Sequence, residues 1–314
     1  MSDDIGAAAP FGDVLSASVK DRRSQILLGL DPEPATLWPD ALEAGNGLPD
    51  GSLPRERAAA AVAAHCSLVL AATAEFCVGV KLQLASFERL GVEGRAALDF
   101  VVAAAKAHGL IVLADGKRGD IGISASSYAA SLFGRTQTPW GDVDGLGVDA
   151  VTVNPLLGAE TVMPFIEEAR KSGGGVFVLA RTSNPGAADV QDRELVGGGT
   201  VSDVLAGMVN EVGETGSSGI ADVGAVVGAT VPGHLASLRA LMPTAPILLP
   251  GVGAQGGRVE DLGPAFAPGP AGGLITVSRG IVGAGTATDT APAGAAAAAA
   301  EEYRSLAWSI SAAG

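Results

Sequence analysis

Residues 110–120 read LIVLADGKRGD, an apolar run that ends at Asp115 and continues into charged residues and glycines. A short, nearly continuous apolar run is typical of a strand that is buried on both faces of a parallel sheet. In proteins built from such sheets, functional residues gather at the carboxyl ends of the strands. This stretch therefore predicts a buried parallel strand with a candidate site at its end.

Similar apolar runs recur along the chain, and most are followed by an Ala-rich segment with a helical pattern. The predicted strands are residues 25–31, 78–84, 110–115, 147–153, 175–180, 222–229, 246–250 and 273–278. The Ala-rich segments include residues 55–76, 92–108, 199–212 and 292–310. Eight strand–helix units in 314 residues favour a closed (β/α)₈ barrel, the TIM barrel, over an open doubly wound sheet.

The domain organisation predicted from the sequence is simple. No stretch is convincing as a linker between domains, so we expect residues 1–314 to form a single domain. Residues 1–24 are expected to cap the bottom of the barrel, because apolar residues recur there at helical spacing. These apolar residues are Phe11, Val14, Leu15 and Val19.

Several segments look like insertions into the barrel plan. Residues 39–54, 134–146 and 184–198 are rich in polar residues, glycine or proline and are expected to be loops. Residues 262–272 have the composition of a Gly/Pro loop. Residues 283–298 are expected to be a flexible stretch before the last helix.

The charge, the apolar runs and the cysteines of the chain indicate which kinds of binding partner it is not expected to have. A net charge of −14 without a basic stripe argues against nucleic acid, although a few cations could still bind an anionic metabolite. The N-terminus lacks the apolar core of a signal peptide, and no run of 18 apolar residues occurs, so no membrane partner is expected. Cys66 and Cys77 belong to no His/Cys cluster, which argues against a zinc site and fits a reducing cytosol.

Charged residues end the first three predicted strands or lie within them. Asp31 ends the first strand, Lys81 lies in the second, and Asp115 and Lys117 end the third. Asp115 and Lys117 are two residues apart, which places both side chains on one side of an extended segment. Asp120 follows a glycine and need not face the same barrel. A structural ion pair between Lys81 and Asp115 is the alternative, but a buried cluster of alternating charge is costly to keep for stability alone, so a functional site is favoured.

Residues 251–256, GVGAQG, match the G-x-G-x-x-G pattern of dinucleotide sites. In those sites the motif follows the first strand, and an acidic residue stands about 20 positions further on. Here the motif follows the seventh predicted strand, and no acidic residue stands at that distance. A phosphate site built by the loops after the seventh and eighth strands of a barrel explains the motif better.

The motifs together resemble one enzyme family. Residues 115–121, with Asp115, Lys117, Asp120 and Ile121, resemble the D-x-K-x-x-D-I signature of orotidine 5′-phosphate decarboxylases. Further motifs in the family's order are Leu30-Asp31-Pro32, Lys81, Val153-Asn154-Pro155, Ser183-Asn184-Pro185-Gly186, residues 250–257 (PGVGAQGG) and Ser278-Arg279-Gly280-Ile281. The GLDP and VNPLLG stretches and the length resemble its longer, type 2 branch.

The resemblance implies a TIM-barrel lyase that converts orotidine 5′-phosphate to uridine 5′-phosphate and CO₂ in pyrimidine biosynthesis. It implies that the enzyme uses no metal or cofactor and works in the cytoplasm as a homodimer with shared active sites. Lys81, Asp115, Lys117 and Asp120 would form the catalytic network, with Asp120 reaching into the partner subunit's site. Asp31 would bind the ribose hydroxyls with help from Lys81.

Further substrate-binding residues follow from the same resemblance. Ser183 would face the pyrimidine, and Gln255 and Arg279 would hold the phosphate. Ile121 and Ser124 would accompany Asp120 across the interface.

The sequence departs from the family's pattern at two positions. Ser124 stands where Thr is common, which keeps the hydroxyl, and Ser278 stands where Gly is common before the phosphate-binding arginine.

The chemistry suits the residues, because the Lys117 ammonium could stabilise a carbanion at C6 of the pyrimidine and then protonate it. Asp115, beside the departing carboxylate, would disfavour the bound ground state by repulsion.

Two alternative functions remain. One is a metal-dependent sugar-phosphate decarboxylase or aldolase of the same barrel group, which shares D-x-K-x-x-D but would lack the SNPG loop and need Mg²⁺. The other is a non-catalytic phosphate-binding barrel.

Overall fold

The computed structural model describes residues 8–287 and 291–311. Eight parallel strands close into a barrel in the order β1-β10-β9-β8-β7-β6-β3-β2. The strands are β1 (Ile26–Leu30), β2 (Gly79–Gln83), β3 (Ile111–Arg118), β6 (Ala150–Val153), β7 (Gly175–Arg181), β8 (Val223–Val227), β9 (Ile247–Leu249) and β10 (Gly273–Val277). Each overlaps a predicted strand, and the predicted (β/α)₈ TIM barrel is confirmed.

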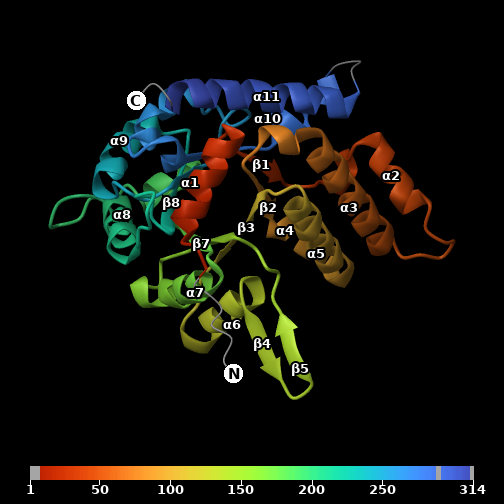
Figure 1. Cartoon of the computed structure of the whole chain (residues 1–314), viewed down its shortest axis with the longest axis horizontal. Coiled ribbons are helices and arrows are strands. Elements are labelled where there is room, and N and C mark those ends of the chain that lie inside the picture. Colours follow the sequence, from red (N-terminus) through yellow and green to blue (C-terminus); the bar gives the residue numbers. More distant parts are fainter. Residues whose placement is uncertain (1–7, 288–290, 312–314) are drawn as a thin grey trace.

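Helices surround the barrel (Figure 1). The longer ones are α1 (Phe11–Arg22), α2 (Pro39–Asn46), α3 (Pro54–Thr73), α5 (Gly91–Ala107), α6 (Gly122–Leu132), α7 (Ala159–Ser172), α8 (Val201–Val212), α9 (Pro232–Leu241) and α11 (Pro292–Ser311). The short ones are α4 (Leu84–Glu88) and α10 (Arg279–Val282). The 3₁₀ helices are η1 (Pro34–Thr36), η2 (Ala74–Phe76), η3 (Pro185–Asp189), η4 (Val259–Phe266), η5 (Pro270–Gly272) and η6 (Ala284–Ala287).

The strands bury both faces, which explains their continuous apolar sequences. In β7, Val176 and Val178 belong to the outer core under the helices, whereas Phe177 belongs to the inner core of the barrel. Leu27 and Leu248 meet Phe177 in the same inner core. Successive side chains of a strand point to opposite faces, so one apolar run supplies both cores.

Helix α1 packs against the inner core at the amino ends of the strands. Phe11, Leu15 and Val19 are buried there, and the ring of Phe11 contacts that of Phe177 edge-on with centroids 6.1 Å apart. A Cβ atom on Gly175 would lie 2.4 Å from the Phe11 ring, so only glycine fits at the start of β7. Residues 1–7 of the predicted capping segment lie outside the described residues.

Two of the segments expected to be loops contain a β-hairpin or an α-helix, and residues 184–198 contain the 3₁₀ helix η3. Residues 134–146 form an antiparallel hairpin of β4 (Arg135–Thr138) and β5 (Gly141–Asp144), which projects from the barrel (Figure 1). Every residue of β5 is exposed, so the strand has no apolar alternation that could have revealed it. Within residues 39–54, helix α2 buries only Ala41 and Gly45, too few for a visible helical pattern.

Two further expectations need correction. Residues 262–272 are largely 3₁₀ helix, in η4 and η5. Helix α11 begins at Pro292, so residues 292–298 are helical and not a flexible stretch. Residues 288–290 lie outside the described part of the chain. Both segments contain proline, which is typical of loops. Proline is also accepted in the first turn of a helix, so it does not exclude one.

One helical segment in the described part of the chain, Pro54–Phe76, is long and apolar enough by composition to cross a membrane. Half of its most apolar window is buried inside the protein. Val62, Val69 and Leu70 of α3 pack into the outer core of the barrel. Packing as a core helix accounts for the apolar composition of α3.

We predict that replacing Phe11 by Ala lowers the free energy of unfolding by about 3–5 kcal/mol, because it leaves a cavity under the barrel. Val14→Ala, on the same helix, is the matched control, since the side chain of Val14 is 39% exposed. Urea titration of both variants measures the difference. A loss for Phe11→Ala no larger than that for Val14→Ala would show that α1 does not support the barrel.

Candidate active site

A cavity of about 780 Å³ opens at the carboxyl ends of the barrel strands. This volume is within the usual range for small-molecule sites. Seven of the ten predicted site residues line it. They are Asp31, Lys81, Asp115, Lys117, Ser183, Gln255 and Arg279.

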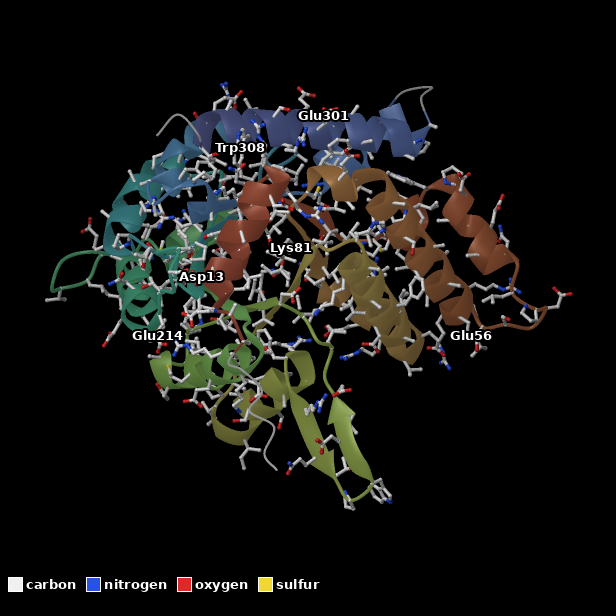
Figure 2. The ribbon with its side chains drawn as sticks, viewed as in Figure 1. Asp13, Glu56, Lys81, Glu214, Glu301 and Trp308 are labelled. Atoms are coloured by element: carbon white, nitrogen blue, oxygen red, sulfur yellow. The ribbon has the colours of Figure 1, made fainter. Side chains whose placement is uncertain are left out.

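The carboxylate of Asp115 is the hub of the cavity's polar contacts. Lys81 Nζ lies 2.8 Å from Asp115 Oδ2, and Lys117 Nζ lies 2.6 Å from Oδ1. Thr152 Oγ1 donates a further hydrogen bond to Oδ1 at 2.8 Å. Lys81 also lies 3.6 Å from Asp31 Oδ1, which extends the network to the first strand. Figure 2 labels Lys81 near the centre of the molecule.

The network keeps its groups charged although Lys81 and Asp115 are buried. Burial by itself would raise the pKa of Asp115, but the charges of Lys81 and Lys117 and their hydrogen bonds lower this pKa to about 2. Burial by itself would lower the pKa of Lys81. The negative charges of Asp115 and Asp31 have the larger effect, so the pKa of Lys81 is raised. The cavity therefore presents alternating positive and negative charges at neutral pH.

The end of β3 is irregular, and this irregularity positions Lys117. The pairing of β3 with β6 shifts register between Ala114 and Arg118, and Lys117 has a φ of +47°, a strained value for a residue with a side chain. Its backbone N–H donates to Thr152 Oγ1 at 3.0 Å. A Cβ atom on Gly116 would lie 2.8 Å from Leu84 Cδ1, so the glycine leaves room for the leucine side chain.

Two loops meet on the opposite side of the cavity. Ser183, after β7, donates through Oγ to Gln255 Oε1 at 3.1 Å. Gln255 lies in the GVGAQG loop after β9, where Gly251, Gly253 and Gly256 all have positive φ. Glycine is the residue that adopts this backbone without strain. The motif thus forms a tight turn after the seventh barrel strand, as the sequence indicated.

Arg279 begins α10 and lines the cavity with an exposed side chain. Ser278, which precedes it, has a φ of −109° that any residue can adopt. A Cβ atom on Gly29 of β1 would lie 2.7 Å from the Cβ of Ser278. The glycine at position 29 therefore leaves the room that the serine at position 278 needs.

The other three predicted residues, Asp120, Ile121 and Ser124, lie outside the cavity lining. Asp120 Oδ1 accepts a hydrogen bond from the backbone N–H of Ile121 at 2.8 Å. Ile121 is 63% exposed, and Ser124 is exposed on α6. The structure does not bring these residues to the site of their own chain.

Sequence reasoning missed several polar residues of the cavity. Thr152 was visible as the polar residue of the apolar strand β6, and Gln83 Nε2 donates weakly to Asp115 at 3.4 Å. Thr276 of β10 lines the cavity, and its buried hydroxyl has no hydrogen-bond partner among the described residues. A single hydroxyl in an apolar strand is common in cores, so the sequence alone did not single it out.

Within residues 8–287 and 291–311, no three His, Cys, Asp or Glu side chains are grouped so as to hold a metal ion. The positive charges next to Asp115 come from lysines.

Known proteins share this chain's sequence and architecture. The model of the orotidine 5′-phosphate decarboxylase / HUMPS family matches residues 24–293. An orotidine 5′-phosphate decarboxylase of Deinococcus radiodurans is 41% identical over 86% of this chain and 88% of its own length. One of Rhodopirellula baltica is 38% identical over 87% and 88%.

A solved structure agrees with these sequence matches. A crystal structure from Streptomyces avermitilis, provisionally assigned as an orotidine 5′-phosphate decarboxylase, covers 99% of both chains with a TM-score of 0.76 and 33% identity. From the extent of these matches, the chain belongs to the orotidine 5′-phosphate decarboxylase / HUMPS family.

Proposed function

We propose that this protein decarboxylates orotidine 5′-phosphate to uridine 5′-phosphate and CO₂ in pyrimidine biosynthesis. The observation that carries the proposal is the Lys81–Asp115–Lys117 network inside the barrel mouth, with Arg279 lining the same cavity. The relatives with 41% and 38% identity are both named for this activity.

The proposed chemistry begins with Asp115. A substrate carboxylate placed beside this fixed negative charge is repelled, which disfavours the bound ground state. Loss of CO₂ relieves the repulsion and leaves an electron pair on C6 of the pyrimidine. Lys117 Nζ, 2.6 Å from Asp115, is placed to stabilise that charge and then to donate a proton to C6.

The rest of the cavity would hold the nucleotide. Asp31, paired with Lys81, accepts hydrogen bonds from the ribose hydroxyls. Ser183 faces the pyrimidine, and Gln255 next to it contacts the phosphate. The Arg279 guanidinium suits a phosphate, because it can form two parallel hydrogen bonds with it.

We further propose a homodimer with shared active sites. Asp120, Ile121 and Ser124 lie outside their own cavity, in keeping with roles in a partner's site. Ile121 and Ile123 are 63% and 87% exposed at the start of α6, an apolar surface that a second subunit would cover. A cytoplasmic location and a single domain over residues 1–314 stay predictions.

Two other functions stay as alternatives. A metal-dependent sugar-phosphate decarboxylase or aldolase would share Asp115, Lys117 and Asp120. A non-catalytic barrel would bind phosphate through Arg279 without turnover. The SNPG loop at the cavity and the paired lysines around Asp115 favour the decarboxylase.

The first test is turnover itself. Incubation with orotidine 5′-phosphate should decrease its ultraviolet absorbance, and the rate should survive dialysis against EDTA, since Lys117 supplies the proton. Activity that disappears with EDTA and returns with Mg²⁺ would instead support the metal-dependent enzyme. Absence of any turnover would support the non-catalytic barrel.

The second test concerns the phosphate. Arg279→Ala should lower kcat/KM for orotidine 5′-phosphate about 30- to 150-fold, the equivalent of about 2–3 kcal/mol for a lost charged hydrogen bond. The nucleoside orotidine, which lacks phosphate, should be affected far less. Arg258→Ala is the matched control, because Arg258 pairs with Glu260 outside the cavity. Equal losses on both substrates would assign Arg279 to the fold.

The third test concerns shared sites. Lys117→Ala and Asp120→Ala dimers should each be nearly inactive. After subunit exchange, about half of the dimers are hybrids, and each hybrid has one site free of both substitutions. Activity should recover to roughly a quarter of wild type per site. Exchanged mixtures that stay inactive would place Asp120 in the site of its own barrel.

A further inference from the structure

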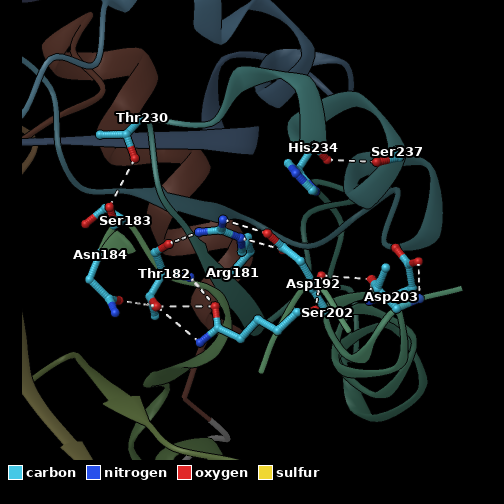
Figure 3. A network of polar contacts seen from close by, with 12 residues as sticks. Arg181, Thr182, Ser183, Asn184, Asp192, Ser202, Asp203, Thr230, His234 and Ser237 are labelled. Atoms are coloured by element: carbon cyan, nitrogen blue, oxygen red, sulfur yellow. Dashed lines mark hydrogen bonds and ion pairs between the residues drawn. The ribbon is translucent and has the colours of Figure 1, made fainter. Parts of the chain in front are cut away.

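The loop after β7 forms one wall of the cavity, yet little of it is packed in the core. Its cavity-lining residues are Thr182, Ser183, Asn184, Gly186, Ala187, Val190 and Gln191. Of these, only Ala187 is buried. Apolar packing therefore does not hold the wall in place, and polar contacts behind it do so (Figure 3).

The strongest of these contacts joins the two ends of the wall. Arg181, the last residue of β7, is 5% exposed. Its Nε and Nη2 atoms donate to the two carboxylate oxygens of Asp192 at 2.8 and 2.9 Å (Figure 3). Its Nη1 atom donates to the carbonyl oxygen of Thr182. One guanidinium thus contacts both Thr182, at the start of the wall, and Asp192, which directly follows its last residue.

Gln191 adds a second connection beside the first. Its Oε1 accepts the backbone N–H of Thr182 at 2.7 Å, and its Nε2 donates to Thr182 Oγ1 at 3.1 Å. The carbonyl oxygen of Gln191 accepts hydrogen bonds from the backbone N–H and Oγ of Ser202 at 2.9 and 3.0 Å. Ser202 is buried in the first turn of α8, so the wall is connected to a rigid helix.

We propose that Arg181, Gln191 and Asp192 form a clamp that positions Ser183 for the pyrimidine, and that the three act as positioning residues. The inference rests on the proposed function. Ser183 directly follows the clamped Thr182, and its Oγ donates to Oε1 of the neighbouring Gln255 at 3.1 Å. Neither Arg181 nor Asp192 lines the cavity, so both act through the wall and not on the substrate.

The chemistry of the clamp defines the variant to use. A planar guanidinium forms two parallel bonds with a carboxylate, whereas the ammonium of lysine is a single point of charge. Arg181→Lys therefore keeps the charge and loses the two-point geometry. Asp192→Asn removes the charge of the other partner and keeps its size.

Arg193→Gln is the matched control. Arg193 lies in the same loop, is exposed, and donates to the carbonyl oxygen of Asp189. Within the described residues, its side chain forms no hydrogen bond or ion pair with Asp192 or with a residue that lines the cavity. Its substitution changes the loop's charge without touching the clamp.

Kinetics and binding form the first arm of the experiment. Arg181→Lys and Asp192→Asn should each lower kcat/KM for orotidine 5′-phosphate about 10- to 100-fold, the scale expected when a reacting group is misplaced by about 1 Å. Affinity for uridine 5′-phosphate should fall, whereas affinity for inorganic phosphate should fall much less, because Arg279 on α10 lies outside the clamp. Arg193→Gln should behave as wild type in all three measurements.

Amide hydrogen exchange is the second arm and needs no turnover. Arg181→Lys should speed exchange in residues 182–191 and leave the barrel strands protected. Faster exchange throughout the barrel, or kcat/KM within about twofold of wild type, would overturn the clamp. A wild-type protein without decarboxylase activity would overturn the proposed function instead, and exchange in residues 182–191 would still test the clamp.

Discussion

A buried carboxylate held between two ammonium groups sets the requirements for the rest of this structure. Asp115 is removed from water, and an unpaired charge in that position would cost several kcal/mol. Lys81 and Lys117 approach its two oxygens from different sides, and Thr152 donates to one of them. Each lysine is in turn kept near a negative charge. The groups depend on one another, so the loss of one leaves the others unbalanced.

The closed parallel barrel meets this requirement because all its strands end at one rim. Lys81 comes from β2, Asp115 from β3 and Thr152 from β6, and these three strands are neighbours in the barrel. Below them, Val226 and Leu248 belong to the inner apolar core and also line the cavity. The core that stabilises the fold therefore also forms the apolar floor of the cavity, and charges interact more strongly beside an apolar surface than in water.

The loops after β7 and β9 complete the cavity above the strand ends. The wall that contains Ser183 is fastened from behind by the clamp of Arg181 and Asp192, and the GVGAQG loop carries Gln255 to meet it. Arg181 and Asp192 contact this wall from outside the cavity, whereas Ser183 and Gln255 line the cavity. Such support matters because an enzyme loses much of its catalytic rate when a reacting group is displaced by about 1 Å.

The eight barrel strands could be predicted from local composition, because a strand buried on both faces is a continuous apolar run. The two-residue spacing of Asp115 and Lys117 also predicted that their side chains lie on one side of the chain, and the structure brings Lys117 Nζ to 2.6 Å from Asp115 Oδ1. The hairpin at residues 134–146 could be recognised only in three dimensions, because its exposed strands have no apolar pattern. The hydrogen bonds from Thr152 to Asp115 and from Arg181 to Asp192 were likewise visible only in the folded structure. A polar pair joined through space leaves no periodicity in either segment, so local composition could not reveal it.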